Sequence, residues 1–231
     1  MTAKEKQQLR DGMLAAWPIC LGYFPIGLAF GVLAQQAGLP WWAVAMMSVL
    51  VFAGSSQFIC VAMLASGVSA AAIIFTTFVV NLRHTLMSSA LAVHLSGVSR
   101  RFLALFAYGV TDESFAVNMA RFREGKWDRR RALVVNQLAN AVWFIATVTG
   151  CLVGQFVPQG ALGIDYALTA MFICLLVFQV HGRIHLLTGL LAAVIAVAWY
   201  LLIPGDSYIV GAAVSAATLG YLLQRYYRRG K

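Results

Sequence analysis

The stretch SAAAIIFTTFVVNLRHTLMSSALAVH, residues 69–94, is long and apolar enough to cross a membrane, yet Arg83 lies near its centre. A spanning helix needs about 20 apolar residues, and an ionisable side chain at that depth costs at least about 2.5 kcal/mol. The next apolar run carries two acids, in Thr111-Asp112-Glu113. These charges predict either a transport or proton pathway inside a membrane protein or a structural ion pair that locks two helices together.

The whole chain has the composition of an integral membrane protein. It has 231 residues, of which 61% are hydrophobic and 11% charged, whereas soluble domains carry about 25% charged residues. The four cysteines lie singly inside apolar runs, which is typical of small buried side chains and not of disulfides or metal ligands. We therefore expect no soluble domain, no metal and no cofactor.

Apolar runs predict an all-α polytopic fold of about eight transmembrane helices. They cover residues 17–36, 41–66, 69–94, 102–118, 132–154, 164–181, 186–203 and 207–223. With the N-terminus in the cytoplasm, the inner connections hold most of the basic residues, and only Arg100 and Arg101 fall outside. The positive-inside rule then favours eight spans with both termini cytoplasmic. Seven spans, with a re-entrant 69–94 run, would export the basic C-terminal tail.

The chain divides into three predicted segments. Residues 1–16 begin with the capping-box spacing Thr2-x-x-Glu5 and predict a cytoplasmic or interfacial helix, with a frayed polar tail as the alternative. Residues 17–223 predict one transmembrane domain, and 224–231 a basic cytoplasmic tail. The basic loop over 121–131 predicts a topology anchor that contacts anionic lipid headgroups, and not a nucleic-acid site.

Several spans carry residues that interrupt helices at membrane depth. The first contains Gly22, Pro25 and Gly27, and the polar runs Gly54-Ser55-Ser56-Gln57 and Asn81-Leu82-Arg83-His84 lie near the centres of the next two. Irregular backbone survives there only where protein or a water-filled cavity satisfies its peptide groups. We therefore expect broken helices that face a substrate, with close packing of small residues as the alternative for Gly54-Ser55-Ser56.

Two further features concern the later spans. Asn136 and Asn140, four residues apart with Gln137 beside them, form a polar stripe that should face the helix bundle or a pathway. The run 207–223 has a dense small-residue pattern, which predicts close helix packing.

Simple helix geometry places the charges at a common depth. At 1.5 Å per residue, Arg83 and the acids Asp112 and Glu113 all come within several ångströms of the membrane midplane. Consecutive spans joined by a short loop are antiparallel neighbours, so Arg83 can meet Asp112 or Glu113. The two acids point about 100° apart, so one can pair with Arg83 while the other faces a cavity.

Four motifs together resemble the AzlC-type branched-chain amino acid exporter family, large subunit. They are Pro18…Gly22…Pro25-x-Gly27, Phe52-Ala53-Gly54-Ser55-Ser56-Gln57-Phe58, Asn81-Leu82-Arg83 and Thr111-Asp112-Glu113, and the likeness spans about residues 12 to 220. The resemblance implies a multi-pass protein of the bacterial inner membrane that works with a small, four-span AzlD-type subunit. It implies gradient-driven efflux of valine, leucine, isoleucine and often methionine. The chain contains no P-loop, so we expect no ATP-driven step.

A zwitterionic substrate suggests roles for the polar residues. Arg83 would meet the carboxylate, helped by backbone amides at the helix breaks near Gly54 and Pro25. Asp112 or Glu113 would receive the ammonium or carry a coupled proton. The wider candidate site adds Asn81, Thr111, Ser55, Ser56 and Gln57, and Phe24, Phe52 and Phe58 are candidates for the side-chain pocket.

Three other kinds of site are possible from the sequence. A pore-forming or structural membrane subunit for another small solute would also place charges and helix breaks at mid-membrane. An intramembrane hydrolase would need Ser55 or Ser56 with His84, but no GxSxG motif is present. His181 and His185 have helical metal-ligand spacing but offer only two ligands, which favours a polar turn. No enzymatic activity is expected.

Overall fold

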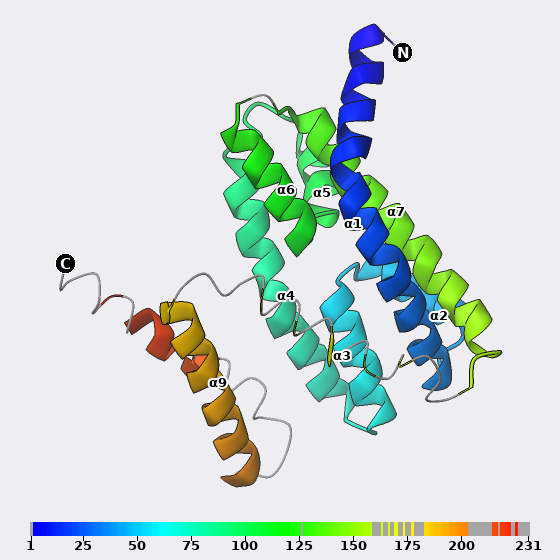
Figure 1. The fold of residues 1–231 in the computed structure, drawn as a ribbon, viewed down its shortest axis with the longest axis vertical. Coiled ribbons are helices and arrows are strands. Elements are labelled where there is room, and N and C mark those ends of the chain that lie inside the picture. The colour runs from blue at the N-terminus through cyan, green and yellow to red at the C-terminus, as the bar shows by residue number, and fades with distance from the viewer. Residues whose placement is uncertain are drawn as a thin grey trace. The chain divides into compact units, whose positions relative to one another are not determined.

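The computed structural model describes residues 2–125, 127–158 and 183–202, with shorter pieces at 163, 166, 169–170, 173, 177, 214–216, 218–222 and 225. The helices are α1 (Ala3–Gln36), α2 (Trp41–Leu50), α3 (Gly54–Ala65), α4 (Ala70–Ala92), α5 (Arg100–Tyr108), α6 (Asp112–Arg123), α7 (Arg129–Gly154) and α9 (Arg183–Leu202), labelled in Figure 1. Within these residues the fold is all-α, as the sequence predicts. α1, α4 and α7 are long and apolar enough to cross a membrane.

The chain forms two compact units. The first comprises residues 1–68 and 80–168, and the second comprises 69–79 and 169–231. α4 contributes its first ten residues to the second unit and the rest to the first. All the mid-membrane site residues predicted from the sequence belong to the first unit.

α1 is one continuous helix of 34 residues. Its N-terminus has the predicted capping box, with Thr2 accepting from the Glu5 N–H and Glu5 accepting from the Thr2 N–H. The helix passes through Pro18 and Pro25 without a break, so the prediction that Gly22, Pro25 and Gly27 interrupt the first span is wrong. Residues 3–16 are likewise the start of α1 and not a separate helix.

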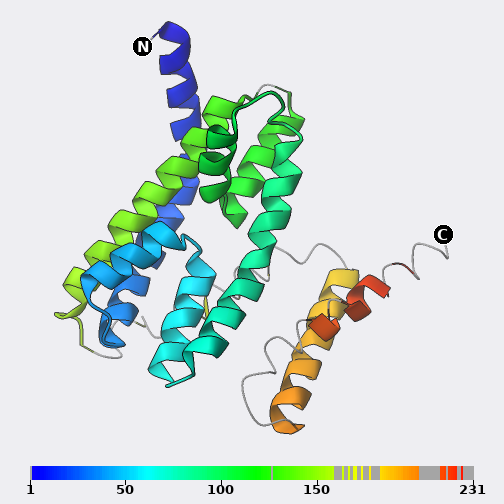
Figure 2. The same ribbon diagram turned by 180° about the vertical axis from the view of Figure 1, so that it is seen from behind.

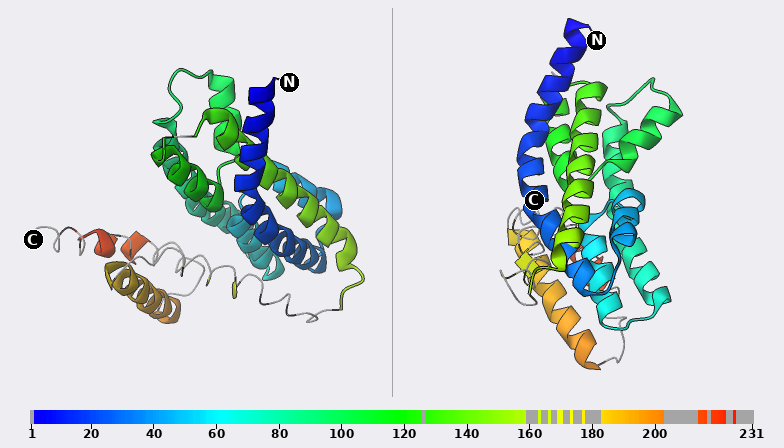
Figure 3. Two further views of the ribbon diagram at one scale, coloured as in Figure 1. Left: turned by 45° about the horizontal axis from the view of Figure 1, so that its top comes forward. Right: turned by 90° about the vertical axis from the view of Figure 1, so that its right-hand side faces the viewer.

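α1 and α7 pack side by side and run in the same direction, as Figure 3 shows. At one end Gln8 donates to Asp128 (2.9 Å), and at the other Gln36 lies 3.5 Å from the Val157 carbonyl. Glycines allow the close approach: a Cβ on Gly31 would lie 2.1 Å from the Thr147 carbonyl oxygen. Small residues therefore let the two helix backbones touch. This parallel pair of long helices is the framework of the first unit.

The predicted second span is two short helices, α2 and α3, separated by Val51–Ala53. This interruption lies immediately before Gly54, where the sequence predicts one. Phe52 adopts a φ of +39°, a conformation that costs an L-residue about 1–3 kcal/mol and persists only where the surroundings hold it. Phe52 is held because its side chain is buried against the ring of Tyr108. The chain turns back here, and α2 and α3 form a helical hairpin (Figure 2).

α5 and α6 form a second hairpin, in a run for which the sequence predicts a single span. The His94 ring, just after α4, stacks on Phe122 near the end of α6, with centroids 4.8 Å apart. α6 therefore returns to the end of the unit where α5 begins. α7 stabilises the break, since Asn136 Nδ2 donates to the Phe106 carbonyl (3.0 Å) and Gln137 Nε2 to the Leu105 carbonyl (3.1 Å). These are carbonyls that a helix C-terminus leaves without intrahelical partners.

α4 is continuous over 23 residues, so the predicted break at Asn81-Leu82-Arg83-His84 is wrong. The polar run lies on an intact helix and is stabilised by its side-chain contacts. The helix presents Arg83 at a fixed place between the two hairpins.

In the second unit, α9 packs against the C-terminal helical segment. A Cβ on Gly220 would lie 2.5 Å from Thr188 Cγ2, so this glycine permits the close contact that the small-residue pattern predicts. Most of the predicted spans 164–181 and 207–223 lies outside the described residues.

Candidate functional site: a charged junction between two helical hairpins

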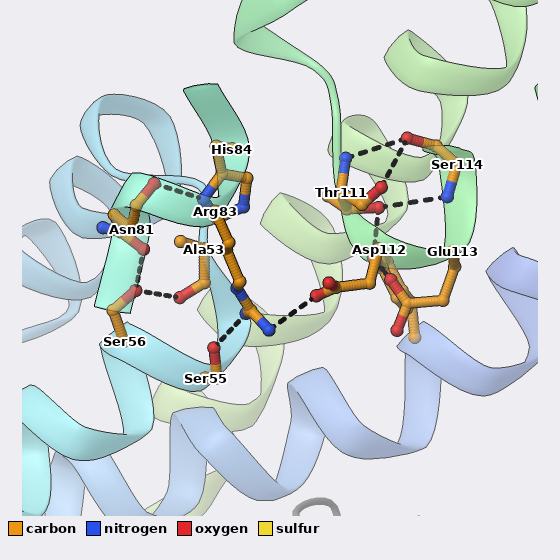
Figure 4. Close-up of polar contacts among 11 residues, drawn as sticks. Ala53, Ser55, Ser56, Asn81, Arg83, His84, Thr111, Asp112, Glu113 and Ser114 are labelled. Atoms are coloured by element: carbon orange, nitrogen blue, oxygen red, sulfur yellow. Dashed lines mark hydrogen bonds and ion pairs between the residues drawn. The ribbon is translucent and has the colours of Figure 1, made fainter. Parts of the chain in front are cut away.

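Arg83 joins the two hairpins. Its guanidinium extends from α4 and reaches Asp112 at the start of α6 and Ser55 at the start of α3 (Figure 4). Nη1 lies 2.9 Å from Asp112 Oδ2, and Nη2 donates to Ser55 Oγ. The side chains of Arg83 and Asp112 are 29% and 27% exposed. The predicted pairing of Arg83 with one of the two acids is therefore confirmed, and the acid is Asp112.

Two helix N-termini meet at this junction. α6 begins with Asp112 and Glu113, so its positive end already has carboxylates in the first turn. α3 differs, because Ala53 provides no side-chain cap and the first turn holds no acid. The free amides of α3 and the guanidinium of Arg83 together make its side of the junction positive.

The serines of α3 are held by polar contacts to α4 and to their own backbone. Ser56 Oγ donates to Asn81 Oδ1 (2.5 Å) and also lies 3.3 Å from the Ala53 carbonyl. The His84 ring contacts the carbonyl of Asn81 (Figure 4). Neither serine has a hydrogen bond to His84 among the described contacts. The geometry therefore gives no support to a serine–histidine nucleophile.

Tyr23 of α1 is a site residue that the sequence did not reveal. Its hydroxyl lies 2.5 Å from Glu113 Oε2 and 2.8 Å from Thr111 Oγ1. Thr111 also caps α6, in a reciprocal box with Ser114. The Glu113 carboxylate thus contacts α1, and not the cavity that the sequence analysis expected. A lone tyrosine in an apolar run has no sequence pattern that would have singled it out.

The two hairpin tips also touch directly. Tyr108 Oη, at the end of α5, donates to the Val49 carbonyl near the end of α2, at 2.6 Å. The ring of Tyr108 lies against Phe52, with centroids 6.1 Å apart. Arg83 is therefore beside a contact between the tips, and any separation of the hairpins would change its environment.

Gln57 lies in the first turn of α3 but is turned toward α7. It is fully buried, accepts from Trp143 Nε1 at 2.9 Å and donates to Ser48 Oγ at 3.2 Å. Ser48 in turn shares a hydrogen bond with Thr147 of α7. This buried polar network anchors the α2–α3 hairpin to α7, so Gln57 is placed behind the junction and not in it.

The other predicted residues lie outside the junction, either in contacts of α7 with the α5–α6 hairpin or on α1. Asn136 is buried and accepts from Asn118 of α6, and Asn140 donates to Tyr108 Oη. The predicted polar stripe therefore faces the α5–α6 hairpin. Gly27 packs against Ala146 and Gly22 has open space around it, so neither lies in the junction.

The end of the unit that holds the N-terminus is rich in charge. Arg131 pairs with Asp11 (2.8 Å) and with Asp128, which caps α7 and also accepts from Gln8. Burial raises the pKa of Asp128, but hydrogen bonds from the Arg131 backbone and Gln8 and the charge of Arg131 outweigh it, so its pKa is lowered. The guanidiniums of Arg121 and Arg131 lie 5.9 and 6.0 Å from the ring centre of Trp127. Much of the predicted lipid-facing loop therefore also has partners within the protein.

The described residues contain no group of three or more side chains suited to a metal ion. His181, one member of the predicted His181–His185 pair, lies outside the described residues.

These features define a polytopic helical membrane protein with an ion pair at the meeting point of two hairpins. The family described as AzlC protein matches residues 18–157, and the chain belongs to this family. It is 30% identical over 214 residues to an uncharacterized membrane protein of Archaeoglobus fulgidus, covering 91% of this chain and 93% of that one.

Two relatives carry more informative names. The chain is 27% identical to the branched-chain amino acid transport protein AzlC of Bacillus subtilis, over 89% of this chain and 80% of that one. It is 29% identical to the inner membrane protein YgaZ of Escherichia coli, over 70% and 67% of the two chains. No solved structure matches the chain.

Proposed function

We propose that this protein is a secondary transporter subunit that exports branched-chain amino acids across the inner membrane of a bacterial cell. The substrates would be valine, leucine and isoleucine, with methionine as a further one. The observation that carries the proposal is the partly exposed Arg83–Asp112 pair at the meeting point of two hairpin tips. The resemblance to a protein named for branched-chain amino acid transport supports the substrate class.

The carboxylate of an amino acid has suitable donors on the α3 side of the junction. Arg83 offers a planar fork of N–H groups, and its buried Nε has no hydrogen-bond partner among the described residues. The first-turn amides of α3 have no acidic neighbour in their own helix. A carboxylate bound to Arg83 would thus also lie near a helix N-terminus, where negative charge is stabilised.

The ammonium would meet the acids on the α6 side. Asp112 is bonded to Arg83 and Glu113 to Tyr23, so the two carboxylates occupy different surroundings. One would receive the substrate ammonium and the other would carry a coupled proton. The aliphatic side chain would lie against Phe52 or Phe58, which are buried near the start of α3, whereas Phe24 is 47% exposed.

Energy would come from the membrane gradient, since the sequence has no P-loop. A small four-span subunit of the AzlD type would complete the exporter, and anionic lipid would contact the basic loop 121–131. Co-purification of the chain with the product of a neighbouring small membrane-protein reading frame would test the partner.

The test is an efflux assay in cells loaded with labelled valine. Arg83→Ala, Asp112→Asn and Glu113→Gln should each reduce efflux strongly when compared at equal abundance in the membrane. Ser89→Ala, on an exposed turn of α4, is a matched control and should transport normally. Wild-type efflux in all three junction variants would contradict the proposal.

A second assay separates a transporter from a pore. Vesicles preloaded with unlabelled valine should accumulate labelled valine by saturable exchange if the protein is a carrier. Uptake that rises linearly with concentration and shows no exchange would support the pore-forming alternative.

A further inference from the structure

The two hairpins occur at the same positions in two successive segments. The first helix of each hairpin ends at Leu50 in α2 and at Tyr108 in α5. The second helix begins at Gly54 in α3 and at Asp112 in α6. It ends at Ala65 in α3 and at Arg123 in α6. Each pair of positions is 58 residues apart. A long helix follows in both cases, α4 from Ala70 and α7 from Arg129.

Local conformation repeats at the same spacing. Gly67 and Gly125 follow α3 and α6, and they have φ angles of +71° and +73°. Ala53 and Thr111 precede α3 and α6, and both have extended backbone. Ser56 and Ser114 are identical residues at the third position of their helices. Segments 41–92 and 100–154 therefore share one design, a short hairpin followed by a long helix.

The two segments point in opposite directions. α7 runs parallel to α1, with Asp128 and Arg131 beside Gln8 and Asp11. The end of α4 lies with the end of α6 and the start of α7, because Phe122 of α6 packs against the core cluster that includes Leu91 and Ala132. α4 is therefore antiparallel to α7, and the α5–α6 hairpin opens toward the end of the unit that holds the N-terminus.

We propose that α2–α4 and α5–α7 are an inverted repeat, and that the two hairpins enter the membrane from opposite faces without crossing it. No helix of either hairpin can span the bilayer, because α2, α3, α5 and α6 have 10, 12, 9 and 12 residues. A span needs about 20. Each hairpin is long enough to reach mid-membrane and return, and the two tips meet beside Arg83.

The basic residues agree with this topology better than with eight full spans. With the N-terminus inside, α4 runs from outside to inside, which moves Arg100 and Arg101 to the cytoplasmic side. Together with the spans predicted at 164–181, 186–203 and 207–223, six crossings keep both termini inside. Sixteen of the 17 basic residues then face the cytoplasm: Lys4, Lys6, Arg10, Arg100, Arg101, Arg121, Arg123, Lys126, Arg129, Arg130, Arg131, Arg183, Arg225, Arg228, Arg229 and Lys231. The remaining one is Arg83 at the junction.

This arrangement has a consequence for any solute that reaches Arg83. The α2–α3 hairpin lies between the junction and the outer face, and the α5–α6 hairpin lies between the junction and the inner face. Inverted repeats whose discontinuous helices meet at mid-membrane are the structural basis of alternating access in many transporters. The topology itself holds whichever solute is carried, so its test is independent of the proposed function.

Cysteine labelling distinguishes the two topologies, because they assign opposite sides to the same loops. In a chain whose four native cysteines are replaced, Ser66→Cys and Ser96→Cys are conservative changes at exposed loop positions. A membrane-impermeant maleimide should label Ser66→Cys in intact cells and Ser96→Cys only after permeabilisation. Eight full spans predict the reverse.

Two further variants calibrate the assay. Gln155→Cys is outside and Glu124→Cys is inside in both topologies. If a serine variant is poorly produced, Val68→Cys and Val98→Cys replace Ser66→Cys and Ser96→Cys as the test pair. Labelling of both test loops from one side, or the reversed pattern, would overturn the proposal.

Discussion

Arg83 has two partners that belong to different hairpins, and this sets the electrostatics of the junction. Asp112 neutralises its charge and Ser55 fixes its orientation. An ion pair desolvated in this way is not by itself a source of stability, because desolvation offsets much of the attraction. Its position at the contact of two hairpins is the observation on which the proposed transport function rests.

Tyr23→Phe tests the contact between α1 and the start of α6. Removing the hydroxyl leaves Glu113 without its 2.5 Å partner, and losing a hydrogen bond to a charged group costs roughly 1.5–3 kcal/mol. We expect a lower thermal unfolding midpoint for the detergent-solubilised protein and reduced valine efflux. Tyr221→Phe, which alters a side chain that is 61% exposed, should change neither. An unchanged midpoint in Tyr23→Phe would show that Glu113 does not depend on Tyr23.

At the level of single residues, the sequence predicted the charged side chains of the site but not the side chains that contact and position them. Arg83, Asp112 and Glu113 stand out because hydrocarbon disfavours them. Tyr23 does not stand out, since a tyrosine is compatible with many positions in a helix bundle. Gln57 was predicted as a site residue, and not as the buried contact to α7 that it makes. Their roles depend on Glu113 and Trp143, which are 90 and 86 residues away in the chain.

At the element scale, α1 shows why proline is a weak break signal in a membrane helix. Pro18 and Pro25 lie within an uninterrupted helix. A proline leaves a backbone carbonyl in the preceding turn without its hydrogen bond. In membrane helices neighbouring helices, side chains and small changes of helix geometry satisfy that carbonyl, so the helix persists. The α5–α6 break shows the opposite case. It depends on amides from Asn136 and Gln137 of α7, which no local pattern around residues 109–111 reveals.

Glycine substitutions test the α1–α7 framework. Gly31→Ala and Gly150→Ala would place a Cβ 2.1 and 2.2 Å from backbone oxygens of the other helix, those of Thr147 and Leu28. Overpacking of this kind costs about 1–3 kcal/mol or more, so both variants should lose thermal stability. Gly22→Ala is the control, because nothing lies within 4 Å of its added Cβ and alanine favours helix by up to about 1 kcal/mol. Equal destabilisation in all three would contradict the packing.

Asp128 makes the contact between α1 and α7 sensitive to acid. Because its folded-state pKa is lowered below the ordinary value of 3.8, its contribution to stability is complete above that value. The contribution is lost as the pH falls through the lowered pKa. Asp128→Asn keeps a capping side chain but not the charge, so its stability should fall less steeply than wild type below about pH 4. Thermal unfolding across pH 3–7 measures the difference, and parallel curves would contradict it.

At the scale of the whole molecule, composition and hydropathy were sufficient to predict an all-α membrane protein. They could not distinguish a long apolar run that crosses the bilayer from one that turns back at its centre. The runs 41–66 and 102–118 have suitable length and polarity for a span, yet each falls in a segment that folds as two short helices. Arg100 and Arg101 were the signal in the sequence for the different topology, because eight spans place these basic residues outside, against the positive-inside rule.

We propose that the Arg83–Asp112 pair serves transport and is not needed for stability. The double variant Arg83→Met/Asp112→Leu replaces both charges with apolar groups of similar size, a change that often leaves stability unaffected. We predict that it is produced and folded like wild type, with the same unfolding midpoint, and that valine efflux is abolished. Wild-type efflux by the folded double variant would contradict the account, because a site without its cation and its acid would still carry the substrate.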